Sequence, residues 1–184
     1  MSENKLSISR NAMNYGGMTG IALFLVFILS SIVGTKLAGL MQIINYTALG
    51  IGIYIGTKNY RDSELKGVMS YSSALYSGFL ISFFASVIIA FAVFLYIKLV
   101  DASILDKIME QTEQSMMDRG LSDDEVEKQM QAAQLFMNPT SMAFFSILGY
   151  TLIGTLIALV TSAFVKKQTP NSGDSFENFI QQNQ

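Results

Sequence analysis

Four long runs of this chain contain no charged residue. They cover residues 11–35, 37–57, 67–97 and 140–165 of a sequence of 184 residues. A helix needs about 20 apolar residues to cross the hydrocarbon core of a bilayer, and each run is long enough. We therefore expect an all-α integral membrane protein with four spanning helices.

The residue types that the chain lacks exclude several kinds of chemistry. It contains no cysteine and no histidine. Disulfide bonds, thiolate metal sites and histidine general bases are therefore excluded. Charged residues make up 14% of the chain, and because they are confined to segments outside the four runs, a water-soluble helical domain is disfavoured.

The boundary residues divide the chain into one membrane domain and a tail. The expected spanning helices cover residues 13–33, 37–57, 71–97 and 140–165. The first of them is too long for the core of a signal peptide, so we expect a retained signal anchor. Residues 1–167 then form a single membrane domain, and the polar segment 168–184 is expected to be a disordered cytoplasmic tail.

Each expected spanning helix carries small residues four positions apart, which places them on one face. In the first helix these are Ala12, Gly16 and Gly20. Small residues let neighbouring helices approach closely, so the four stripes predict a compact four-helix bundle. The later helix-packing positions are Gly52, Gly56, Gly78, Ser82, Ser86 and Gly154.

Four polar residues interrupt the second run and are expected near the middle of the bilayer. They are Gln42, Asn45, Tyr46 and Thr47. Hydrogen bonds between helices are the favoured interpretation, because no ionisable group accompanies these residues. A polar track for a ligand or an ion is the alternative.

The connection between the second and third runs is dense in charge. Gly67 is expected to break the local structure, and Ser70 is expected to cap the third helix. Since the chain has no tryptophan, tyrosines must form any aromatic belt at the membrane surface. The candidates for this belt are Tyr54, Tyr60 and Tyr71.

An acidic segment at 99–138 separates the third and fourth runs. It holds nine Asp or Glu residues and three Lys or Arg residues, and its apolar residues recur at helical spacing. Gly120 predicts a helix end, while Ser122 and Glu125 predict a capping box that starts a second helix. We expect an amphipathic helical hairpin outside the membrane, whose first helix either is separate or continues the third spanning helix.

The positive charges favour a cytoplasmic N-terminus and a cytoplasmic C-terminus. The inner side then holds seven of them: Lys5, Arg10, Lys58, Arg61, Lys66, Lys166 and Lys167. The outer side holds five over a longer stretch: Lys36, Lys98, Lys107, Arg119 and Lys128. The positive-inside rule prefers this orientation, which makes the hairpin extracytoplasmic.

Several motifs in order resemble a known family. They are the Gly-rich first hairpin, KNYRD…GVMSYSSALYSG, MMDRGLSDDEVEKQM…FMNP and LIGTLIALVTSAFVKK. Together they resemble the four-helix bacterial inner-membrane family, common in Bacteroidetes, that is known as domain of unknown function 4199. The resemblance covers about residues 10–168 and implies a bacterial inner-membrane protein. It also implies an accessory role beside an envelope glycosyltransferase, and it assigns no catalytic residue.

The sequence favours a non-enzymatic membrane subunit that acts as a structural or accessory part of an envelope complex. The expected partners are membrane lipid and either another membrane protein or a second copy of the chain, with no nucleic acid, cofactor or metal. In the tail, Phe176, Phe179 and Ile180 are candidates for partner binding, because they are spaced as one helical turn. A small oligomeric transporter or channel for a small or uncharged solute is the alternative.

Overall fold

The computed structural model describes residues 2–33 and 37–167, with the side chains of residues 2–6 and 38 left aside. This part of the chain contains six α-helices and one short π-helical turn. The elements are α1 (Ser2–Val33), α2 (Ala38–Asn59), η2 (Tyr60–Glu64), α3 (Tyr71–Leu99), α4 (Ser103–Asp118), α5 (Asp123–Phe136) and α6 (Pro139–Val165). The expectation of an all-α chain is confirmed.

Four of the helices are long and apolar enough to cross a membrane. The spans lie at Ser7–Val33, Gly39–Glu64, Tyr71–Leu99 and Pro139–Val165. Their outer faces carry large apolar side chains, as at Ile21, Leu152 and Phe164, which is the surface that a lipid environment requires. The chain is therefore a membrane protein, as its uncharged runs predict.

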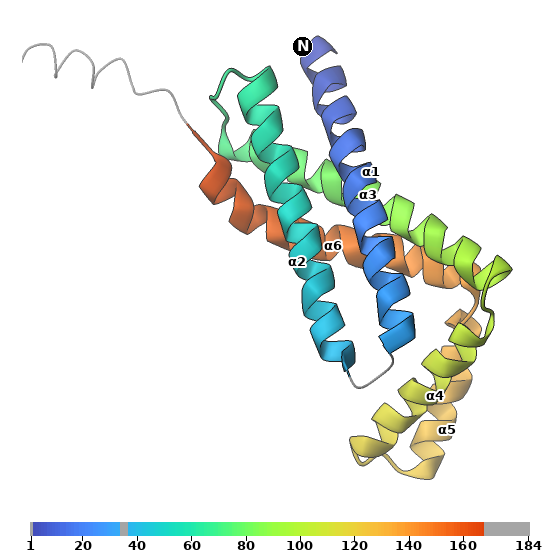
Figure 1. The fold of residues 1–184 in the computed structure, drawn as a ribbon. Helices are drawn as coiled ribbons and strands as arrows, with labels where there is room; N and C mark the ends of the chain where they lie inside the picture. Colours follow the sequence, from blue (N-terminus) through green and yellow to red (C-terminus); the bar gives the residue numbers. More distant parts are fainter. Residues whose placement is uncertain (1, 34–36, 168–184) are drawn as a thin grey trace, which may run out of the picture.

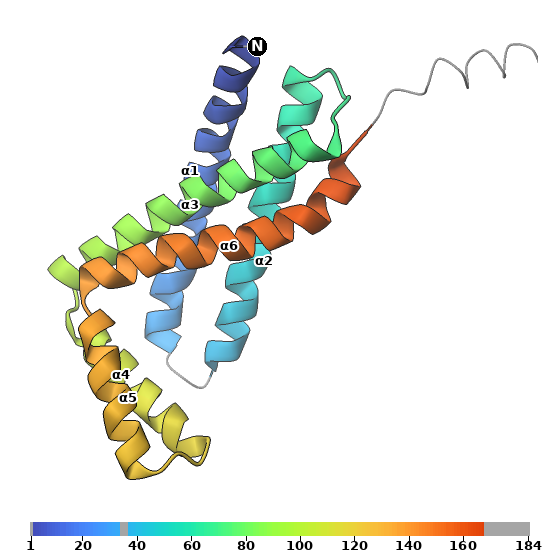
Figure 2. The same ribbon diagram turned by 180° about the vertical axis from the view of Figure 1, so that it is seen from behind.

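The four long helices pack as two crossed pairs. Helices α1 and α2 lie side by side, as do α3 and α6, and the second pair runs obliquely across the first (Figures 1 and 2). Large apolar side chains fill the layer between the pairs, and Leu23, Leu49, Ile53 and Ile81 are fully buried there. Helix α3 contacts all three of the others and is the centre of the assembly.

Local sequence signals fix the ends of several helices. The Oγ atom of Ser70 accepts a hydrogen bond from the Ser73 backbone N–H at 3.3 Å, so Ser70 caps α3 as predicted. Asn138 caps α6 in the same way, with Pro139 in its first turn. Gly67 and Gly120 both have positive φ, which favours glycine, and both lie at predicted breaks.

Helices α4 and α5 form a hairpin that projects from the end of the molecule where α1 ends and α2 begins (Figure 1). The predicted capping box is present, because the Glu125 carboxylate accepts hydrogen bonds from Ser122 N and Oγ at 3.0 and 2.8 Å. Asp101 accepts hydrogen bonds from Ser103 N and Oγ, so α4 starts as a separate helix and does not continue α3.

The opposite end of the molecule is tied together by a second apolar cluster. It joins Ile8 of α1, Tyr60 of η2, Met69, Ala74 of α3 and Val165 of α6. Only 2% of Tyr60 is exposed, so the expectation of an interfacial belt is wrong for this residue. The reason is that α2 runs on into η2 instead of ending at residue 57, which turns the Tyr60 ring inward.

Candidate functional site

The small residues of α1 and α2 lie at helix crossings. A Cβ atom on Gly16 would lie 2.6 Å from Phe84 Cβ and 2.8 Å from the Ile81 carbonyl oxygen. Gly20 meets α3 in the same way, at Ile88. On α2, Gly52 lies against Thr19, and Gly56 lies against Tyr15 and Ile81. These glycines therefore let α1 approach both α2 and the backbone of α3.

The stripe on α3 faces α6. A Cβ atom on Gly78 would lie 2.7 Å from Ala158 Cβ, and Gly154 lies against the side chain of Ser82. Ser82 donates a hydrogen bond to the Gly78 carbonyl oxygen at 2.8 Å. Ser86 and Thr151 share a hydrogen bond of 3.0 Å between their hydroxyl oxygens. All six packing positions predicted from the sequence thus lie at helix–helix contacts.

The polar residues of α2 divide into two groups. Gln42 donates a hydrogen bond to the Tyr46 hydroxyl at 2.6 Å, and the Asn45 side chain is hydrogen-bonded to Tyr150 of α6. Thr47 is exposed on another face and joins neither interaction. Because α2 starts at Ala38, Gln42 lies about 6 Å along it, closer to the helix start than to the centre expected from the sequence.

Gln42 and Tyr46 line a recess of about 220 Å³ between α2 and α6. Its other lining residues are Ser146, Gly149, Tyr150 and Ile153. Ser146 also lines an apolar groove of about 460 Å³ at the α5–α6 junction, with Phe136 and Phe145. We call the recess and the groove together the outer surface, after the side that the positive charges of the sequence predict for this end. It combines hydrogen-bonding groups with exposed aromatic rings.

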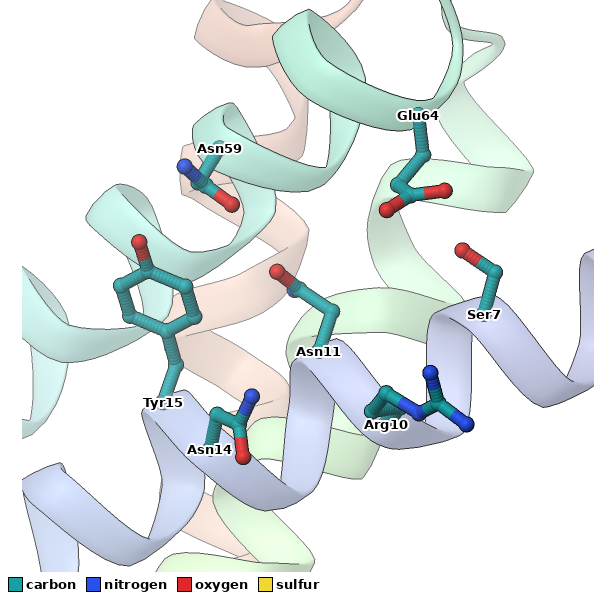
Figure 3. Close-up of a pocket in the computed structure, with 7 residues that line it drawn as sticks. All are labelled: Ser7, Arg10, Asn11, Asn14, Tyr15, Asn59 and Glu64. Carbon is teal, nitrogen blue, oxygen red and sulfur yellow. The ribbon is translucent and has the colours of Figure 1, made fainter.

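The opposite end of the molecule holds a larger polar cavity of about 610 Å³ (Figure 3). The seven lining residues are Ser7, Arg10, Asn11, Asn14, Tyr15, Asn59 and Glu64. The first five come from α1, while Asn59 ends α2 and Glu64 ends η2. We call it the inner cavity, after the side that the positive charges of the sequence predict for this end. The Asn11 side-chain amide donates to the Gly56 carbonyl oxygen at 2.9 Å, which fixes α1 against α2 beneath it.

The segment after α6 is anchored beside this cavity. Met69 and Lys167 exchange two backbone hydrogen bonds of 2.8 and 3.0 Å. Arg61 donates to the Val165 carbonyl oxygen at 2.9 Å and pairs with Asp62 at 2.7 Å. The last turn of α6 therefore finds partners for carbonyl groups that a helix end leaves free.

Among the described residues outside the membrane spans, two carboxyl groups have shifted pKa values. Hydrogen bonds from Ser103, with Lys107 nearby, lower the pKa of Asp101. Hydrogen bonds from Ser122 likewise lower the pKa of Glu125. Both acids act as helix-start groups in the hairpin. Within the described residues, no three His, Cys, Asp or Glu side chains converge as metal ligands.

Sequence reasoning missed the inner cavity, although one signal for it exists. Ser7, Asn11 and Asn14 recur at intervals of four and three and make a polar face on the first turns of α1. The partner-binding candidates Phe176, Phe179 and Ile180, and the whole expected tail at 168–184, lie outside the described residues.

These features define a class: an all-α membrane protein with four membrane-length helices and a helical hairpin between the third and fourth. The chain belongs to the family described as protein of unknown function (DUF4199), whose family model matches residues 14–167. The resemblance drawn from its motifs is thereby confirmed. No curated protein and no solved structure matches the chain.

Proposed function

We propose that this protein is a non-enzymatic accessory subunit of the bacterial inner membrane, and that it binds another membrane protein through its outer surface. An envelope glycosyltransferase is the partner class that the family resemblance implies, and a second copy of the chain is the other. The four spanning helices supply a stable anchor, and the outer surface supplies the contact.

The observation that carries the proposal is the exposure of hydrogen-bonding groups on an otherwise apolar helix pair. Gln42 is exposed and lines the recess together with the tyrosines Tyr46 and Tyr150. Polar side chains within a membrane span favour contact with another helix over contact with lipid tails. A partner helix in the recess would contact Gln42 and cover Phe145 in the adjoining groove.

Transport of a small or uncharged solute is the alternative, and the arrangement of polar groups argues against it. The recess lies at the start of α2, and the inner cavity lies near its end. Between them the described core is packed with Leu49, Ile53 and Ile81, each fully buried. One copy of the chain therefore offers a solute no continuous polar route through this core.

The proposed orientation puts the N-terminus, the 65–70 loop and the end of α6 in the cytoplasm, with the hairpin outside. The arrangement in Figure 2 supports this, because these three segments lie at the end of the molecule remote from the hairpin. Since the chain has no cysteine, single-cysteine variants report the side of each segment. In intact cells, an impermeant maleimide should label Gln111→Cys and spare Val68→Cys, whereas the reverse pattern would overturn the orientation.

The test measures two properties of the same variants: recovery of the complex from membranes and uptake of a solute. We expect Asn45→Leu to reduce recovery of a complex from native membranes, because it removes the hydrogen bond to Tyr150, a residue that lines the recess. Thr47→Leu is the matched control, since Thr47 lies on α2 but outside the recess. Loss of solute uptake with full retention of the complex would favour transport instead.

A further inference from the structure

The inner cavity brings two opposite charges to one space without pairing them. Arg10 and Glu64 both line it, and within the described residues neither forms an ion pair. The two ion pairs among the described residues join Arg61 to Asp62 and Lys107 to Asp101. A guanidinium and a carboxylate that face one cavity separately can each meet the opposite charge of a single ligand.

Neutral polar groups surround these charges. Asn14 and Asn59 add amide groups, and the Tyr15 hydroxyl lies at the Asn59 side (Figure 3). The Ser7 Oγ atom is shielded from solvent and has no hydrogen-bond partner among the residues that the structure describes. The cavity size also lies within the range of about 300–1,000 Å³ that is usual for small-molecule sites.

The depth of the cavity places it among lipid headgroups. From Val33, where α1 ends, to Asn14 is about 28 Å of helix, which nearly equals the thickness of a hydrocarbon core. Helix α2 is similarly about 33 Å long and ends at Asn59. The cavity residues on both helices therefore begin where the hydrocarbon ends and the headgroup layer starts.

We propose that the inner cavity binds the headgroup of a phospholipid that carries a phosphate joined to a primary ammonium, as in phosphatidylethanolamine. Arg10 holds the phosphate, for which a guanidinium is well suited. Glu64 accepts hydrogen bonds from the ammonium, assisted by the amide oxygens. A quaternary ammonium has no N–H to donate and is usually held by several aromatic rings, whereas Tyr15 is the single aromatic residue in the wall.

The test measures lipid retention by the full-length, delipidated protein in detergent with native mass spectrometry. The probes are phosphatidylethanolamine, phosphatidylglycerol and phosphatidylcholine with identical acyl chains. We expect phosphatidylethanolamine to bind about tenfold more tightly than the other two lipids, because its ammonium donates one additional charge-assisted hydrogen bond. Equal retention of all three lipids by the wild-type protein would overturn the proposal.

Three variants and one control variant test how Arg10 and Glu64 hold the two charges of the headgroup. Glu64→Gln should abolish the preference for phosphatidylethanolamine over phosphatidylglycerol, and Arg10→Gln should weaken retention of both. Lys166→Gln is the matched control, because it removes an exposed charge near the same end without touching the cavity. Circular dichroism establishes that each variant is folded, and Arg10→Lys should restore part of the binding. A Glu64→Gln protein that is folded and keeps the full preference would contradict the assignment.

A competition experiment distinguishes a lipid from a soluble molecule with the same headgroup. Water-soluble glycerophosphoethanolamine should displace the lipid only at a large excess, because it lacks the acyl chains that lie in the bilayer. Competition at equal concentration would show that a soluble phosphoethanolamine compound is the ligand, and it would overturn the lipid assignment.

Discussion

Ser86 of α3 and Thr151 of α6 share a hydrogen bond of 3.0 Å between their hydroxyl oxygens, in the interface that joins the third and fourth spanning helices. Ser86 is fully buried and also donates to the Phe83 carbonyl oxygen at 2.7 Å. The pair stands one helical turn beyond Ser82 and Gly154, which lie in contact in the same interface. Close packing and polar contact therefore occur together along α3.

This relationship gives a coupling energy that can be measured. We expect Ser86→Ala and Thr151→Ala each to lower the free energy of unfolding in mixed micelles. Their double-mutant cycle should give a coupling of about 0.6 kcal/mol, the average for hydrogen bonds between membrane helices. Strictly additive effects of the two substitutions would show that the hydroxyl groups do not interact.

Adjacent glycines on α1 provide a second test. Gly16→Ala should lower the free energy of unfolding by about 1–3 kcal/mol, the usual cost of overpacking, because the new methyl group meets the α3 backbone at Ile81. Gly17→Ala is the matched control, since nothing lies within 4 Å of the added atom. Alanine there should be neutral or should stabilise the helix by up to about 1 kcal/mol. Equal effects at the two positions would contradict the close crossing of α1 and α3.

The contact between Arg61 and the end of α6 provides a third test. Arg61→Gln should cost about 1.5–3 kcal/mol, because the partly buried guanidinium loses its hydrogen bond to the Val165 carbonyl oxygen. Asp62→Asn should cost less than Arg61→Gln, since the ion pair of Asp62 with Arg61 is exposed. Thermal unfolding in detergent measures both values. Asp62→Asn being the more damaging change would show that the ion pair matters more than the helix end.

The capping box at the start of α5 should respond to acid. The pKa of Glu125 is lowered in the folded hairpin by hydrogen bonds from Ser122. A lowered pKa means that the carboxylate stabilises the hairpin above the ordinary glutamate pKa of about 4.3, and that this contribution is lost as the pH falls through the folded value. The amide resonance of Ser122 should therefore titrate below pH 4.3, and Glu125→Gln should remove that titration. A midpoint at the ordinary value would exclude the capping interaction in solution.

The sequence predicts helix ends better than helix partners, because the signals for a helix end act over only a few residues of the chain. Ser70, Gly120 and Ser122 act on atoms only a few residues away, so their roles follow from local spacing. The glycine stripe of α1 shows that one face is closely packed, but not that this face meets α3 as well as α2. That choice depends on the crossed arrangement of the two helix pairs, to which side chains far apart in the chain contribute.

The sequence likewise predicts some residues of each candidate site but not the residues that the fold brings next to them. Gln42 and Asn45 are conspicuous in an apolar run, whereas their neighbours Ser146 and Tyr150 come from α6 and cannot be assigned to them by spacing. The inner cavity needs both the polar face at the start of α1 and the π-helical turn that carries Glu64. Without that turn, Glu64 is one more charge in a polar loop.

The measurement that tests the central proposal most directly is photo-crosslinking from position 42 in native membranes, with a photoreactive amino acid in place of Gln42. The proposed function predicts a crosslink to one membrane protein in near-stoichiometric yield, and a much weaker crosslink from position 47 as the matched control. A crosslink to a second copy of this chain would identify self-association as the contact. Crosslinks to lipid alone from both positions would contradict the assignment of the outer surface as a protein interface.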